Sequence, residues 1–76
     1  MEGLGPGNRR GVRIRLNGME RTTGAETVAG LVEELRLPRQ TVLVEHNGEA
    51  LGRDAWEWTV LREGDALEIL KVAAGG

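Results

Sequence analysis

The 76-residue chain contains no cysteine, no serine, no tyrosine and no phenylalanine, and its single histidine is His46. The lack of cysteine excludes a disulfide framework, a thiolate nucleophile and a cysteine-based metal site. The lack of serine excludes a serine nucleophile. A lone histidine cannot build a metal site of the usual spacing, so we interpret His46 as a structural or surface residue and expect no bound metal.

Long apolar runs are lacking as well, and the first residues contain Gly, Pro and Arg, which is not the pattern of a signal peptide or a membrane span. Ten basic and twelve acidic residues are mixed along the chain, with a net charge of -2, which is not the pattern of a nucleic-acid binder. We therefore expect a cytoplasmic protein that binds neither nucleic acid nor membrane. Its length predicts one domain with a small core and no enclosed active site.

The beginning of the chain divides into a leader and a hairpin. Residues 1–11 are rich in glycine and nearly free of apolar side chains, so we expect a flexible leader. Residues 12–16 then alternate apolar side chains with arginine and are followed by Asn17-Gly18. Both turn residues tolerate a positive φ, so the pattern predicts a β-hairpin with a type I′ turn.

A helix is predicted next. Apolar residues recur at helical spacing at Val28, Leu31, Val32 and Leu35. Thr27 is placed to cap the first turn, and Pro38 prevents the helix from continuing. The segment predicts one amphipathic helix of about nine residues.

The second half predicts further strands. Residues 41–46 form a strand with Val42 and Val44 inward, a second turn follows at Asn47-Gly48, and Leu51 starts a partner strand. Residues 66–72 are too apolar for a strand with one face in water, so we place this strand centrally in the sheet. The order predicts an α+β roll, with one main helix on a mixed sheet of four to five strands.

The chain ends on Gly75-Gly76, two small residues after the last predicted strand. Two residues without Cβ can pass through a channel that is too narrow for any side chain, and the four residues 73–76 span about 13 Å when extended. Because 12 of 76 residues are glycine, a Gly-Gly end also arises by chance in such a composition. We expect a mobile tail that carries its carboxylate into another protein.

Several local features occur together from residue 12 to residue 76. They are Asn47-Gly48-Glu49 after an apolar strand, Arg53-x-x-Trp56, Glu63-Gly64-Asp65, Glu68-Ile69 in the closing strand and the Gly75-Gly76 end. In this combination the chain resembles the ThiS-type sulfur carrier proteins of thiamine biosynthesis. The resemblance implies a ubiquitin-like β-grasp domain over residues 12–72, followed by the tail.

The resemblance also implies a mechanism in which this protein is a cosubstrate and not an enzyme. A ThiF-like adenylating partner would use ATP and Mg²⁺ to activate the carboxylate of Gly76, and a sulfur donor such as a cysteine desulfurase would supply the sulfur of a C-terminal thiocarboxylate. A ThiG-like thiazole synthase would then receive this sulfur. Gly75 and Ala74 would be required for threading the tail into these partners, and the carrier itself would bind no cofactor.

Two alternatives stay open at this level. Related carriers for molybdopterin synthesis or for transfer-RNA thiolation share the fold and the tail, and Arg53-x-x-Trp56 favours the thiamine branch among them. A ubiquitin-like interaction module with an incidental Gly-Gly end is the alternative from another class.

A partner surface is predicted on the open face of the sheet. Leu43 and Leu70 are opposite in phase to the core residues and form an apolar patch there, unless a small sheet simply exposes some leucine. Arg13 and Arg15 project from the first strand on the same side and would steer a partner. The acidic residues are interpreted as solvated surface groups.

The two tryptophans receive different interpretations. Trp56 is interpreted as a packing residue, because a large ring buries much area in a small core. Trp58 stands where members of the family often carry a polar residue, and it is either partly buried or a partner contact.

Overall fold

The computed structural model describes residues 11–72. It begins with the predicted hairpin, in which strand β1 (Val12–Leu16) pairs antiparallel with strand β2 (Met19–Thr23). The turn residues have positive φ angles of 50° at Asn17 and 84° at Gly18. The type I′ prediction is confirmed, because only this turn type needs positive φ at both central residues.

Helix α1 (Val28–Glu34) has seven residues and begins where the sequence indicates, with the Thr27 side chain accepting a hydrogen bond from the Gly30 N–H at 3.1 Å. It ends earlier than predicted. Arg36 takes a left-handed φ of 60°, and the N–H groups of Arg36 and Leu37 bond back to the carbonyls of Glu33 and Val32 at 2.9 and 3.2 Å. This pair of bonds is a Schellman motif, so the backbone itself stops the helix ahead of Pro38.

The second half of the chain adds three strands and two short turns of 3₁₀ helix. In chain order they are η1 (Arg39–Thr41), β3 (Val42–His46), β4 (Glu49–Leu51), η2 (Arg53–Ala55) and β5 (Ala66–Lys71). Two predicted boundaries were wrong. Thr41 belongs to η1, where its N–H bonds to the Pro38 carbonyl at 3.1 Å, and Leu51 ends strand β4 instead of starting it.

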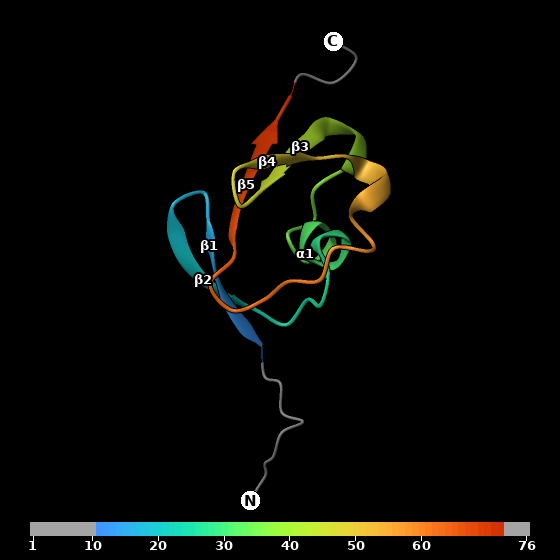
Figure 1. Ribbon diagram of the computed structural model, residues 1–76. Coiled ribbons are helices and arrows are strands. Elements are labelled where there is room, and N and C mark those ends of the chain that lie inside the picture. Colours follow the sequence, from blue (N-terminus) through green and yellow to red (C-terminus); the bar gives the residue numbers. More distant parts are fainter. Residues whose placement is uncertain (1–10, 73–76) are drawn as a thin grey trace, which may run out of the picture.

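The strands form one five-stranded sheet in the order β2-β1-β5-β3-β4. Strand β5 pairs parallel with β1 and antiparallel with β3, so the central position predicted for the last strand is confirmed. Helix α1 lies on one side of this sheet, and the chain between β4 and β5 passes around the helix (Figure 1). One helix on a five-stranded mixed sheet gives the predicted α+β architecture of a β-grasp roll.

The core lies between the helix and the inner face of the sheet. Within residues 11–72 it consists of Ile14, Val28, Leu31, Val32, Val42, Val44, Trp56, Leu61, Leu67 and Ile69. Trp56 is fully buried and donates its indole N–H to the Leu51 carbonyl at 3.3 Å, so its predicted packing role is confirmed. Over the described residues, no helix is long and apolar enough to cross a membrane.

Candidate functional site

The last described residue is tied to the body of the domain. The Val72 N–H donates to the Thr41 carbonyl at 2.8 Å, which continues the pairing of β5 with β3 by one residue. Ala74, Gly75 and Gly76 lie outside the described residues, as does the leader except for Gly11. The threading and carboxylate roles of these residues therefore stay predictions, and the structure supplies the anchor from which residues 73–76 continue.

Beside this anchor, the open face of the sheet carries two leucines. Leu43 and Leu70 are directly opposite each other on β3 and β5 and are 49% and 52% exposed. The prediction that both leave the core is confirmed, and their role in partner binding stays a prediction. The two leucines form a cross-strand apolar pair next to the last described residue.

The same face carries charges of both signs. Arg13 and Arg15 alternate with the buried Ile14, so both point to the open side as predicted. The Arg13 guanidinium contacts Glu63 at 3.4 Å and Glu20 at 3.6 Å. The Arg13 backbone N–H, which donates to Glu63 at 3.0 Å, holds the pKa of that carboxyl below its ordinary value, and the guanidinium adds to the effect. Arg13 thus lies between two carboxylates, and its predicted steering role stays a prediction.

Sequence reasoning missed an acidic pair beside the leucines. Glu45 on β3 and Glu68 on β5 are directly opposite each other. Each lies two residues along its strand from Leu43 or Leu70, on the same face of the sheet. Like charges in this position repel each other and destabilise a sheet. The alternation of the sequence puts each carboxylate on the open face, but only the register of the two strands brings them together.

Trp58 is 79% exposed and does not belong to this face. It lies in the loop after η2, whose Trp56 and Thr59 carbonyls accept the N–H groups of Ala29 and Val28 at the start of α1. This places Trp58 on the helix side of the sheet, away from Leu43 and Leu70. Of its two alternatives, partial burial is therefore wrong for the isolated chain, and a partner contact there would be separate from the sheet face.

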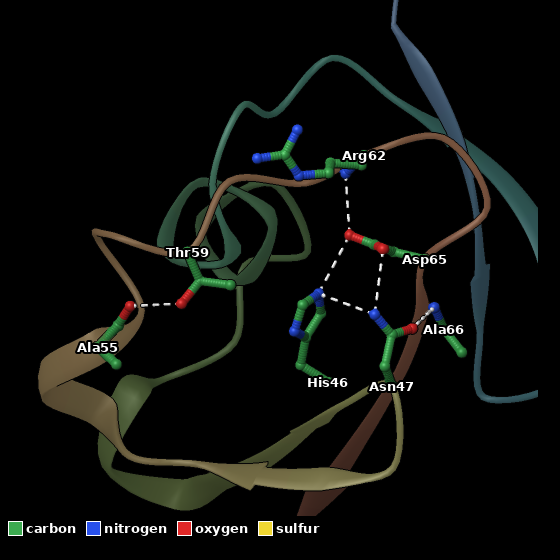
Figure 2. A network of polar contacts seen from close by, with 7 residues as sticks. All are labelled: His46, Asn47, Ala55, Thr59, Arg62, Asp65 and Ala66. Carbon is green, nitrogen blue, oxygen red and sulfur yellow. Dashed lines mark hydrogen bonds and ion pairs between the residues drawn. The ribbon is translucent and has the colours of Figure 1, made fainter.

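A polar network joins the turn after β3 to the start of β5 (Figure 2). His46 Nε2 lies 3.1 Å from Asp65 Oδ2, the Asn47 amide donates to Asp65 Oδ1 at 3.2 Å, and the Arg62 N–H donates to Oδ2 at 2.9 Å. The Ala66 N–H donates to Asn47 Oδ1 at 2.8 Å. This agrees with a structural role for His46. The surface interpretation of Asp65 was wrong, because the residue is buried, with 8% of its surface exposed.

The network also sets the charge state of Asp65. Burial raises the pKa of a carboxyl, but the hydrogen bonds from Arg62, His46 and Asn47 outweigh it, so the pKa of Asp65 lies below its ordinary value. The ionised carboxylate therefore holds the turn between residues 62 and 65 against the Asn47 turn. Within residues 11–72, no three histidine, aspartate or glutamate side chains gather as metal ligands.

An open groove of about 520 Å³ lies at the other end of the domain, lined by Gly11, Gly24, Glu26, Thr27, Val60 and other residues. Its polar side chains are Glu26 and the Thr27 hydroxyl, which is already engaged as the helix cap. A carboxylate and a bonded hydroxyl do not make a nucleophile and base pair, so the residues described in this groove offer no recognisable catalytic set.

The comparisons with known proteins agree with this geometry. A protein-family model described as the ThiS family matches residues 14–76. The chain belongs to the ThiS family. Two solved structures are similar to this ThiS-family chain, and both are proteins of Geobacter metallireducens.

The first is a crystal structure of thiamine biosynthesis protein ThiS, with 38% identity and a TM-score of 0.71, covering 86% of this chain and 100% of that one. The second is a solution NMR structure of a thiamine biosynthesis protein, with 36% identity and a TM-score of 0.69, covering 86% of this chain and 88% of that one. No curated protein sequence matches this chain significantly. The family match includes Gly75-Gly76, so the tail is part of the ThiS pattern.

Proposed function

We propose that this protein is a sulfur carrier of thiamine biosynthesis, whose Gly76 carboxylate is converted to a thiocarboxylate. The observation that carries the proposal is the family match, which runs through the tail to residue 76. The two similar solved structures, both thiamine biosynthesis proteins, favour the thiamine pathway over molybdopterin synthesis and transfer-RNA thiolation.

The chemistry explains why a partner enzyme is needed. A carboxylate does not react with a sulfur nucleophile, because its leaving group would be oxide. A ThiF-like partner would let a Gly76 oxygen attack the α-phosphorus of ATP, with Mg²⁺ on the phosphates, which releases pyrophosphate and leaves an acyl adenylate. A sulfur nucleophile supplied by a donor such as a cysteine desulfurase would displace AMP. If this nucleophile is a persulfide, the product is an acyl disulfide, and a thiol of the partner then attacks its outer sulfur and leaves with it as a disulfide, which releases the thiocarboxylate. A ThiG-like thiazole synthase would take up the sulfur from it. We place the carrier and these reactions in the cytoplasm.

The carrier's own part is to present its tail. Gly75 and Gly76 have no Cβ, so a partner can enclose them in a narrow channel and contact their backbone in extended form. The Val72 N–H bond to Thr41 supplies a fixed starting point next to Leu43 and Leu70. No catalytic group is required from the carrier, and it acts as a protein cosubstrate.

Mass spectrometry tests the proposal. The protein is co-expressed with a ThiF-like adenylating enzyme and a cysteine desulfurase, and the intact mass should rise by about 16 Da when sulfur replaces one carboxylate oxygen. A variant that lacks Gly76 is the matched control and should gain no mass. An unchanged mass in the loaded sample would favour the interaction module, and loading without thiazole formation by a ThiG-like synthase would favour another carrier pathway.

A further inference from the structure

A single guanidinium holds the turn that precedes strand β3. Arg53 Nε donates to the Arg39 carbonyl at 2.8 Å, and Arg53 Nη2 donates to the carbonyls of Gln40 and Val42, each at 3.1 Å. The planar fork of an arginine presents its donors in a rigid arrangement, which a lysine ammonium cannot reproduce. This one side chain therefore restrains the backbone from residue 39 to residue 42.

The carbonyl of Thr41 lies between those that Arg53 binds, and it is the one that anchors Val72, at 2.8 Å. Thr41 is held from its other side as well, since its N–H and its hydroxyl both donate to the Pro38 carbonyl, at 3.1 and 2.9 Å. The position of the Val72 anchor thus depends on the turn that Arg53 clamps.

Trp56 supports the same turn through a contact between its ring and the side chain of Arg39. The Arg39 guanidinium lies 5.0 Å from the centre of the Trp56 ring, within the range of a cation–π contact. Trp56 is fully buried, and its backbone N–H donates to the Arg53 carbonyl at 3.2 Å. Arg53 and Trp56 are three residues apart, so the Arg53-x-x-Trp56 element connects η1 to the core through both backbone and side chain.

We propose that Arg53 is a positioning residue for the C-terminal tail. By clamping the carbonyls on either side of Thr41, it holds the anchor of Val72 and so sets the point from which residues 73–76 enter the active site of the adenylating partner. The inference rests on the proposed function, because it takes the tail to be the reacting segment. Four residues span only about 13 Å, so a displaced anchor leaves little slack for bringing the carboxylate within about 3.5 Å of the reacting phosphorus.

The first test uses the carrier alone. Arg53→Ala and Arg53→Lys are compared with the wild type by amide hydrogen exchange, and the Val72 amide should exchange about tenfold faster in both variants. The Ile69 amide, which bonds to Asn17 Oδ1 at 2.7 Å, is the internal control and should change little. Equal acceleration of both amides would mean a general loss of stability and would overturn the proposal. Wild-type protection of Val72 in the lysine variant would assign the effect to charge and would overturn it as well.

The second test measures adenylation by a ThiF-like enzyme as ATP–pyrophosphate exchange that depends on the carrier. Arg53→Ala should lower kcat about tenfold or more, because a misplaced carboxylate reacts slowly once bound. Its KM should stay within about twofold, since Leu43 and Leu70 are unchanged. Partial unfolding would instead raise the apparent KM and leave kcat unchanged, which is the result expected for the core variant Val28→Ala. Arg62→Ala, which removes another exposed arginine, should behave as wild type.

A double-mutant cycle shows whether Arg53 acts through the anchor. Val72→Pro removes the N–H that bonds to Thr41 and should lower kcat as Arg53→Ala does. If Arg53 works through this bond, the double variant loses no more than either single variant. Additive losses, or wild-type kcat in Arg53→Ala, would overturn the proposal. If the wild-type carrier is not adenylated at all, the proposed function fails, and the exchange of the Val72 amide still decides whether Arg53 holds the anchor.

Discussion

The two faces of strand β5 carry similar apolar side chains in opposite surroundings. Leu67 and Ile69 are 0% and 7% exposed against the helix side, whereas Leu70 is 52% exposed on the open side. Burial of apolar surface stabilises a fold by about 25 cal/mol per Å². The inner face therefore contributes to folding, whereas the partner contacts that we propose involve the outer face and the tail. Stability and function should respond to different residues of one strand.

The tail should give the largest functional effect. Gly75→Val should abolish thiocarboxylate formation, because the branched side chain would not fit the narrow partner channel that we propose for the tail. The melting temperature should stay unchanged, since the substitution lies beyond the anchored residue Val72. Intact-mass measurement and thermal denaturation check the two halves of this prediction. Ala73→Gly adds no side chain and is the matched control. Normal sulfur loading of Gly75→Val would contradict the mechanism.

The inner face should give the largest effect on stability. Leu67→Ala removes a fully buried side chain from the central strand and should lower the free energy of unfolding by about 2–5 kcal/mol. Leu70→Ala makes the same chemical change on the open face and should cost less than about 1 kcal/mol. Urea denaturation of both variants measures the difference directly. Equal losses of unfolding free energy in the two variants would mean that both faces of β5 contribute equally to stability, which would contradict the comparison.

Binding should depend on the outer face. Leu70→Glu should weaken binding to the ThiF-like enzyme about tenfold or more, because it replaces an exposed apolar contact with a charge next to Glu45 and Glu68. The domain should still fold, and calorimetric titration gives the dissociation constant. Thr22→Glu adds the same charge to the edge strand of that face and is the control. An unchanged dissociation constant for Leu70→Glu would move the docking surface elsewhere, with Trp58 the next candidate.

The smallest effect is expected for the acid dependence of stability. The pKa of Asp65 is lowered in the folded state, so its contribution is present above the ordinary carboxyl pKa of about 4 and is lost as the pH falls through the lower folded value. Asp65→Asn should therefore lower stability at pH 7 by about 1 kcal/mol and flatten the acid side of the stability profile. Thermal denaturation from pH 2 to pH 7, a range that includes the ordinary carboxyl pKa of about 4, is the measurement. An unchanged acid slope would assign that slope to Glu34 and Glu63, whose pKa values are also lowered.

Much of the fold could be predicted because its signals are local. The Thr27 cap, the Asn-Gly turns and the apolar alternation each depend on residues within one turn or one strand. The exposure of Leu43 and Leu70 followed from the same alternation. Their position beside the tail anchor did not follow from it, because it depends on the register of β3 against β5. The tail itself was recognised from the order of its residues.

The missed features depend on contacts between distant segments. Asp65 was assigned to the surface because its partners His46 and Asn47 lie on another strand and its turn. The pairing of Glu45 with Glu68 required the register of β3 against β5. The clamp of Arg53 on residues 39–42 joins two short turns that have no hydrophobic periodicity. Long-range placement of this kind has no signal in a single sequence.

The two Asn-Gly turns show where local determination ends. Their asparagines have nearly equal φ angles, 50° at Asn17 and 51° at Asn47. The turn conformation is local, because Asn and Gly both tolerate the positive φ that it requires. Their side chains differ. Asn17 bonds to the backbone of Ile69, 52 residues away, and Asn47 to the N–H of Ala66, 19 residues away. The sequence determined the turns by itself, and tertiary structure decided their partners, because only the insertion of β5 between β1 and β3 brings both asparagines to that strand.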